Sequence, residues 1–259
     1  MATFQIDTSF LDNIKSLIVQ GNNTLLINKL KPIHYADIAE IIETLSIEEA
    51  TYIIKLLKSE TTADALTEVD PDTREQILDN LSIKEIAREV SELKTDDATD
   101  LILELPEARK EKVMSQIQDD EHVKDIRDLL RYDENTAGGL MAKELVKVEE
   151  NLSVLKCLNK MRAQAENVTR VHSIYVVDQN NVLKGRLSLK DLITANSIDK
   201  VKDIYIPKVD FVTVDQENEE VAKIMSKYDL EAIPVVNNKK ELLGRITIDD
   251  IVDVIKEEA

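Results

Sequence analysis

The heptapeptide Gly-Arg-Leu-Ser-Leu-Lys-Asp at residues 185–191 returns 59 residues later as Gly-Arg-Ile-Thr-Ile-Asp-Asp at residues 244–250. The glycine, the hydroxyl residue and the final aspartate all match at this one offset, which is hard to produce by chance. A repeated motif indicates that two copies of one supersecondary unit follow each other along the chain. We therefore expect a duplicated domain in the C-terminal half.

Each copy predicts the same local structure. In the first, β-branched runs at residues 173–178 and 183–188 are separated by an Asn-Asn turn, and a helix is expected over residues 189–195. In the second, the corresponding strands are residues 232–236 and 242–247, and the helix covers residues 248–256. Strands that alternate with helices indicate an α/β module.

The first half of the chain has a helical period. From Asp12 to Leu130 apolar residues recur at steps of three and four, and Gly21 is the only glycine. Ser46 to Glu49 and Ser82 to Glu85 predict capping boxes that start helices. A loose leucine-plus-cap motif recurs at residues 30–32, 45–50, 81–87 and 93–98, and the turn at residues 69–72 starts another helix.

Short helices with tight turns predict a stacked superhelix, a fold whose usual role is interaction. The expected fold is therefore multidomain α and α/β. We predict an all-α superhelical domain over residues 1–131, followed by α/β repeats over residues 132–200 and 201–259.

Composition limits the partners. The chain has 51 acidic and 33 basic residues, a net charge of −18, 3% aromatic residues and no tryptophan. This field repels phosphate backbones, and base-stacking side chains are scarce, so we expect no nucleic-acid partner. The acidic surplus favours cations, but on composition alone solubility is the better explanation.

The sequence also bears on the compartment. Cys157 is the single cysteine and lies in an apolar helical run, so we expect a core residue in a reducing setting. The N-terminus has no signal-peptide pattern, and no stretch reaches the roughly 18 apolar residues of a membrane helix. We expect the chain as given to be soluble.

The duplicated Gly-x-x-Ser/Thr-x-x-Asp motif, which follows a Val-Val strand, resembles the CBS repeat, and two such repeats form one module. A fuller match extends over residues 132–141, 183–193 and 219–254, which look like the cytoplasmic region of MgtE magnesium channels. A helical domain precedes the CBS pair in that family too. The resemblance covers essentially the whole chain, most specifically from Tyr132 onward.

The resemblance implies a regulatory region without enzyme activity. Mg²⁺ is expected to bind between the helical domain, the CBS pair and a connecting helix, and to favour a closed pore. The transmembrane pore would follow the last residue and is absent from this chain. The resemblance further implies a homodimer through the CBS domains, at the cell membrane on its cytoplasmic side.

The residue chemistry is compatible with magnesium, which prefers oxygen ligands. Asp96 and Asp100 stand at i and i+4 on one predicted helix face, and Asp250 and Asp253 at i and i+3 on another. Taken alone, acids in the first turn of a helix are better explained by the helix dipole. The resemblance instead implies metal ligands at Asp64, Asp96, Asp100, the Gly139 carbonyl, Glu219, the Ser226 carbonyl, Asp229, Asp250, Asp253 and Glu258. Asp64 stands where the family has a glutamate.

CBS pairs commonly bind adenosine ligands, and the resemblance implies nucleotide chemistry at Ser188, Lys190 and Asp191, with ATP as the expected ligand. Asp250 is the equivalent aspartate of the second repeat. It is therefore a candidate both as a magnesium ligand and as a nucleotide-binding residue. Ser173 stands where a base-stacking aromatic is expected, with Tyr175 close by in sequence.

Two alternative functions remain open at this stage. One is an adenosine-nucleotide-binding CBS regulator with a helical docking domain. The other is a freestanding scaffold.

The sequence does not indicate a phosphate loop, a zinc site or a catalytic nucleophile. Gly138-Gly139 is a lone glycine pair rather than a phosphate loop. His34, His122 and His172 have no zinc-like spacing to one another or to Cys157. No nucleophile has a neighbouring base in a known motif.

Overall fold

The structure is a computed structural model that describes residues 6–166, 168 and 170–257. The chain divides into two compact units. The first comprises residues 1–93 and 97–124 and is called here the helical unit. The second comprises residues 94–96 and 125–259 and is called the repeat unit.

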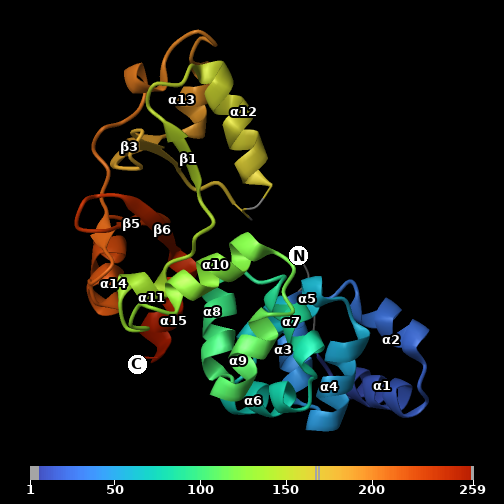
Figure 1. The fold of residues 1–259 in the computed structure, drawn as a ribbon. Helices are drawn as coiled ribbons and strands as arrows, with labels where there is room; N and C mark the ends of the chain where they lie inside the picture. The colour runs from blue at the N-terminus through green and yellow to red at the C-terminus, as the bar shows by residue number, and fades with distance from the viewer. Residues whose placement is uncertain (1–5, 167, 169, 258–259) are drawn as a thin grey trace. The chain divides into compact units, whose positions relative to one another are not determined.

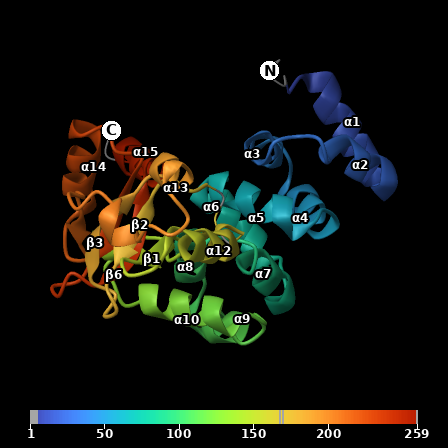
Figure 2. The same cartoon turned by 90° about the horizontal axis from the view of Figure 1, so that it is seen from above.

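Short helices build the N-terminal half, as the sequence predicts (Figures 1 and 2). The longest of them, α1, has 12 residues. The helices are α1 Thr8–Val19, α2 Asn23–Leu30, α3 Tyr35–Glu43, α4 Ile47–Leu56, α5 Ser59–Glu68, α6 Pro71–Asp79, α7 Ile83–Val90, α8 Thr95–Glu104, α9 Glu107–Met114 and α10 Asp120–Leu129.

The predicted capping boxes are confirmed. At the start of α4 the Glu49 amide donates to Ser46 Oγ at 3.3 Å, and the Ser46 amide donates to Glu49 Oε2 at 3.0 Å. Ser82 and Glu85 form the same pair at the start of α7, at 3.3 and 2.7 Å. Each box satisfies two amides that have no partner within the helix, and so fixes where the helix begins.

Alternate helices of the helical unit pack on one another. Helix α3 packs on α5, α5 on α7 and α7 on α9, while α4 packs on α6. This next-but-one pattern is typical of stacked helical hairpins. Fully buried aliphatic side chains fill the layers between the helices, among them Ile38, Ile53, Leu66, Ile77 and Ile86. The stack is therefore held mainly by hydrophobic burial.

The repeat unit contains two three-stranded sheets of the same topology. In the first, β1 runs parallel to β2, and β2 pairs antiparallel with β3; in the second, β4, β5 and β6 do the same. The elements are α11 Ala137–Leu140, β1 Val146–Glu149, α12 Val154–Ala165, β2 Ile174–Val177, β3 Leu183–Leu187, α13 Leu189–Thr194, the 3-10 turn Val201–Asp203, β4 Val212–Thr213, α14 Asn218–Lys227, β5 Ala232–Val236, β6 Leu242–Thr247 and α15 Ile248–Glu257.

Both predicted hairpins and the helices that follow them are confirmed in position. The helical run expected around Cys157 is α12, whereas the sequence analysis did not predict the strands β1 and β4 or the helix α14. The predicted domain boundaries at residues 131 and 200 stay a prediction.

Helices cover one face of each sheet, and each repeat has its own core. In the first repeat, Cys157 of α12 is fully buried beside Val148, Ile174 and Leu192. Burial raises the pKa of the Cys157 thiol to about 11, so it stays protonated at neutral pH. Its predicted role as a core residue is confirmed.

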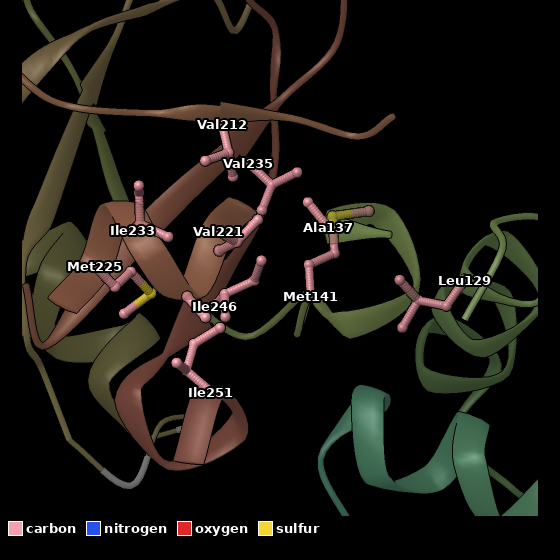
Figure 3. Packing of buried hydrophobic residues seen from close by; sticks show 11 residues of the cluster. Leu129, Ala137, Met141, Val212, Val221, Met225, Ile233, Val235, Ile246 and Ile251 are labelled. Atoms are coloured by element: carbon pink, nitrogen blue, oxygen red, sulfur yellow. The ribbon is translucent and has the colours of Figure 1, made fainter. Parts of the chain in front are cut away.

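The core of the second repeat includes residues from outside the repeat. Figure 3 shows Val221, Met225, Ile246 and Ile251 clustered with Met141. Ala137 and Leu129 complete the same cluster from α11 and α10. Residues from Leu129 to Met141, far from the second repeat in sequence, are therefore part of its core.

The inner faces of the two sheets form a third cluster, of Tyr175, Val177 and Leu183 with Val236 and Leu242. Backbone bonds also join the two hairpins, because the Leu183 amide donates to the Lys240 carbonyl at 2.8 Å and the Leu242 amide to the Asn181 carbonyl at 2.9 Å. The repeats therefore form one module.

Membrane-spanning helices are not found in the part of the chain that the structure describes, since none of its helices combines the required length with sufficient apolarity.

Candidate functional site

The predicted magnesium ligands lie on several elements. Asp64 is half-buried on α5; on α8, Asp96 is buried, with 7% of its surface exposed, whereas Asp100 is exposed. Asp96 and Asp100 are one helical turn apart, so they share a face of α8, as predicted.

Gly139, whose carbonyl is a predicted ligand, lies on α11, and the second repeat carries the remaining described ligands. Glu219 and Ser226 are exposed on α14, and Asp229 is exposed directly after it with a φ of 50°. Asp250 lies in the first turn of α15. Asp253 lies on the same helix, but its side chain is outside the described residues, as is all of Glu258.

No group of three or more His, Cys, Asp or Glu side chains that could hold a metal ion is found among the residues whose side chains the structure describes. The ligand set therefore stays a prediction.

Asp250 has a clear local role. The Thr247 amide and hydroxyl both donate to Asp250 Oδ2, at 2.8 and 2.9 Å, which caps the start of α15. Burial, partly offset by the Thr247 bonds, raises the pKa of the Asp250 carboxyl, and the neighbouring Asp249 charge adds to the rise. A cation that comes close to the Asp250 carboxyl would favour its ionised form and so lower its pKa.

In the first repeat, Asp191 is likewise hydrogen-bonded to a hydroxyl residue at a helix start, that of α13. Its amide donates to Ser188 Oγ at 3.0 Å, and the Ser188 hydroxyl donates to Asp191 Oδ2 at 2.5 Å. Lys190 between them is exposed. The shared Ser/Thr-x-x-Asp motif therefore builds a helix start in both repeats, and the predicted nucleotide residues Ser188, Lys190 and Asp191 lie together on it.

Tyr175 does not offer a stacking surface. Its side chain is 1% exposed and packs in the cluster between the two sheets. Ser173 lies just before β2, so the position where a base-stacking aromatic was expected carries a serine.

The two glycines of α11 serve close packing. A Cβ at Gly138 would lie 2.6 Å from the Tyr132 ring, and one at Gly139 would lie 2.4 Å from the Asp133 carbonyl oxygen. The amides of Ala137 and Gly138 donate to the Gln216 and Val214 carbonyls at 2.7 and 3.0 Å. These contacts hold the segment against the second repeat.

Sequence reasoning missed one polar contact of the repeat unit. The Glu144 carboxylate accepts from the Thr95 amide at 3.1 Å and from the Thr95 hydroxyl at 2.8 Å. Glu144 thereby caps the first residue of α8, the helix that carries Asp96 and Asp100. No local motif signals this contact, because the two residues are far apart in sequence.

Comparisons with known proteins agree with this architecture. The family model for the MgtE intracellular N domain matches residues 33–135, and the CBS domain model matches residues 137–197 and 201–257. The fold is therefore a helical N-terminal domain followed by a CBS pair.

Magnesium transporters MgtE of two bacteria are similar in sequence. The protein of Thermus thermophilus is 43% identical over 134 residues, which are 52% of this chain and 30% of that protein. The protein of Enterococcus faecalis is 39% identical over 134 residues, with the same coverage of each chain. The chain thus spans about a third of the length of the curated relatives it matches.

Two solved structures match nearly the whole chain. The cytosolic domain of the Mg²⁺ channel MgtE in complex with ATP has a TM-score of 0.87 and 32% identity over 94% of this chain and 99% of that one. The soluble part of a magnesium transporter has a TM-score of 0.83 and 28% identity, covering 96% and 98%. The chain belongs to the MgtE family of magnesium transporters and corresponds to its cytosolic region.

Proposed function

We propose that this chain is the magnesium-sensing cytosolic region of an MgtE-type magnesium channel or transporter, and that it has no enzyme activity of its own. Mg²⁺ binds at acidic sites between the helical domain and the CBS pair and favours the closed pore. The observation that carries the proposal is the nearly full-length match to the cytosolic domain of a Mg²⁺ channel. The pore belongs to the same protein beyond this chain, and the region lies on the cytoplasmic side of the cell membrane.

The residues of the chain support a cation sensor. Its net charge of −18 leaves acidic faces that repel one another when no cation is bound. The proposed ligands are oxygen donors: Asp64, Asp96, Asp100, the Gly139 carbonyl, Glu219, the Ser226 carbonyl, Asp229, Asp250, Asp253 and Glu258. Magnesium that binds the compact state better than the open state shifts the population toward it. The domains of this mechanism are residues 1–131, 132–200 and 201–259.

Limited trypsin digestion tests the proposal. Arg131 follows α10, and its side chain is 75% exposed, so the bond after it is a suitable reporter of domain closure. We expect millimolar Mg²⁺ to slow cleavage at Arg131. Asp100→Asn should raise the Mg²⁺ concentration for half-maximal protection on the order of tenfold, as expected for the loss of one charged ligand.

Glu68→Gln is the matched control, because Glu68 is also an exposed acid of the helical unit and is not a proposed ligand. Sodium chloride at the same ionic strength controls for charge screening. Equal cleavage rates with and without Mg²⁺ would refute the sensor.

ATP is the second proposed ligand, at Ser188, Lys190 and Asp191, and the ATP complex of the similar structure favours it. A nucleotide-regulated CBS module with a helical docking domain is the alternative function. Calorimetric titration with ATP should show binding that Lys190→Ala weakens, with Lys227→Ala on α14 as an exposed control. ATP binding without any response to Mg²⁺ would favour the alternative, and no ATP binding would remove it.

We also propose a homodimer through the CBS domains. Exposed apolar side chains gather on two helices of the repeat unit, Leu189 and Ile193 on α13 at 46% and 67%, and Ile248, Val252 and Ile255 on α15 at 39%, 43% and 49%. Apolar side chains at such positions are typical of a subunit contact.

Ile193→Glu is expected to shift the chain toward the monomer, because it places a charge in this apolar contact. Sedimentation velocity at several concentrations measures the shift. Val19→Glu changes a side chain that is 84% exposed on α1 and should leave the assembly unchanged. A wild-type chain that is monomeric at all concentrations would contradict the proposal.

A further inference from the structure

One arginine of the helical unit binds the ends of two helices that carry proposed magnesium ligands. Arg74 lies on α6, and its side chain is only 15% exposed. Its Nη1 donates to the carbonyls of Leu66, Thr67 and Val69, at 3.1, 2.9 and 3.2 Å. These carbonyls belong to the C-terminal end of α5, the helix that carries Asp64.

The rest of the guanidinium binds the end of α8. Arg74 Nε donates to both carboxylate oxygens of Glu104, at 3.1 and 2.9 Å, and Nη2 donates to Glu104 Oε1. Glu104 is the last residue of α8, about one helical turn beyond Asp100. A single planar cation therefore connects the C-terminal ends of both helices.

Both helix ends need a positive charge. The C-terminus of a helix carries a partial negative charge, and an acidic residue there is unfavourable. Helices α5 and α8 end in Glu68 and Glu104, and neither helix has a basic residue in its last turn. The last carbonyls of a helix also lack partners within it. Arg74 supplies charge and donors to both ends from a different helix.

The segment that carries Arg74 is itself fixed. Glu43, the last residue of α3, accepts from the Asp70 amide at 2.6 Å and from the Thr73 hydroxyl at 3.3 Å. Arg74 follows Thr73 directly, so its backbone is tied to the stack at the start of α6. A binding geometry is most exact when the supporting side chains are held in this way.

We propose that Arg74 is a positioning residue of the magnesium sensor: it fixes the helices that carry Asp64 and Asp100, and it does not bind Mg²⁺ itself. The inference rests on the proposed function, because it takes these two aspartates as ligands. Mg²⁺ requires a near-ideal octahedral geometry, so the displacement of a carboxylate lowers its affinity.

The direction of the Mg²⁺ response separates positioning from charge. Arg74→Gln removes a positive charge, and a more negative helical unit attracts Mg²⁺ more strongly. Charge alone would therefore lower the Mg²⁺ concentration for half-maximal protection at Arg131, whereas lost positioning raises it. We expect a rise of about threefold. Arg74→Lys keeps the charge without the planar fork, so it should raise this concentration as well.

Arg109→Gln is the matched control. Arg109 of α9 is 20% exposed, and it donates to Asp79 Oδ1 at 3.2 Å and to the carbonyls of Leu78 and Leu81 at 3.1 and 2.6 Å. It thus binds the end of α6, which carries no proposed ligand. Its replacement removes the same charge and a similar set of bonds, and it should not raise the Mg²⁺ concentration for protection.

Combining Arg74→Gln with Asp100→Asn separates positioning from general destabilisation. When Asp100 no longer acts as a charged ligand, its position matters less, so Arg74→Gln should raise the Mg²⁺ concentration less than it does alone. Destabilisation would act fully in both backgrounds. The proposal is overturned when the effects of the two changes multiply, or when Arg74→Gln acts like Arg109→Gln.

A measurement without Mg²⁺ keeps this inference separate from the proposed function. Spin labels at Glu60→Cys on α5 and Leu103→Cys on α8, both exposed positions, report the spacing of the two helices by electron paramagnetic resonance in EDTA. The buried Cys157 stays unlabelled. We expect Arg74→Gln to broaden the distance distribution and Arg109→Gln to leave it unchanged. An unchanged distribution in Arg74→Gln overturns the positioning role, whereas a broadened one without any Mg²⁺ response of the wild-type chain refutes the sensor alone.

Discussion

Gly185→Ala is expected to lower the free energy of unfolding of the repeat unit by about 3 kcal/mol, the upper range for overpacking. A Cβ at Gly185 would lie 2.2 Å from the Ile206 carbonyl oxygen and 2.7 Å from the Tyr205 ring. The 2.2 Å contact is with backbone, which cannot rotate away as a side chain can. The alanine must therefore push the segment around Ile206 off β3.

That displacement breaks specific bonds. The Arg186 amide donates to the Ile206 carbonyl at 3.0 Å, and the Ile206 amide donates back to the Arg186 carbonyl at 2.8 Å. Arg245 and Ala142 form the same pair in the second repeat, with both distances 2.9 Å. In each repeat the glycine lets a connecting segment join the edge of the sheet.

Urea unfolding followed by circular dichroism measures the effect. Gly244→Ala should cost less than Gly185→Ala, because its Cβ would lie 2.6 Å from the Ala142 carbonyl oxygen but otherwise meets the flexible Met141 side chain. Gly21→Ala is the control, because nothing lies within 4 Å of the added Cβ. An alanine at its φ of 62° should cost about 1 kcal/mol from backbone strain alone. A Gly185→Ala variant no less stable than Gly21→Ala would contradict the argument.

Local features of this fold could be predicted from the sequence. The capping boxes at Ser46 and Ser82 depend only on residues three positions apart, so their geometry follows once a helix forms. The hairpin turns are local as well: Asp178 Oδ1 accepts from the amides of Asn180 and Val182, and Asn237 Oδ1 accepts from those of Lys239 and Glu241.

Contacts between distant segments were not predictable. Nothing near Tyr175 in sequence indicates that its side chain packs with Val236 and Leu242, because that contact arises only when the two sheets pack. The β1 and β4 strands were missed because each is short and pairs with a strand that follows a whole helix.

Glu89→Ala is expected to destabilise the helical unit most strongly at mildly acidic pH, by about 2–3 kcal/mol. The Glu89 side chain of α7 is fully buried. Its Oε2 accepts from the Thr62 hydroxyl of α5 at 2.5 Å, and its Oε1 accepts from Arg88 Nη2 at 2.9 Å. Alanine removes the bond between α5 and α7 and leaves a cavity.

The pH dependence of the Glu89→Ala effect follows from the direction in which the pKa of the Glu89 carboxyl is shifted. Burial, the largest influence, raises the pKa of Glu89 above its ordinary 4.5; the bonds from Thr62 and Arg88 oppose the rise, and the Glu92 charge adds to it. A carboxyl with a raised pKa binds its proton more tightly in the folded state. Its contribution to stability is therefore fully present below pH 4.5 and is lost as pH rises through the folded-state pKa.

The cost of Glu89→Ala should consequently shrink as pH rises, because the wild type then buries a charge that alanine does not carry. Glu89→Gln keeps the shape and cannot ionise, so at neutral pH it should be at least as stable as the wild type. Urea unfolding between pH 4.5 and 8 measures both differences, with Glu48→Ala as a control at an exposed position of α4. A Glu89→Ala cost that grows with pH would show that the ionised carboxylate stabilises the stack, and would reverse the assigned sign.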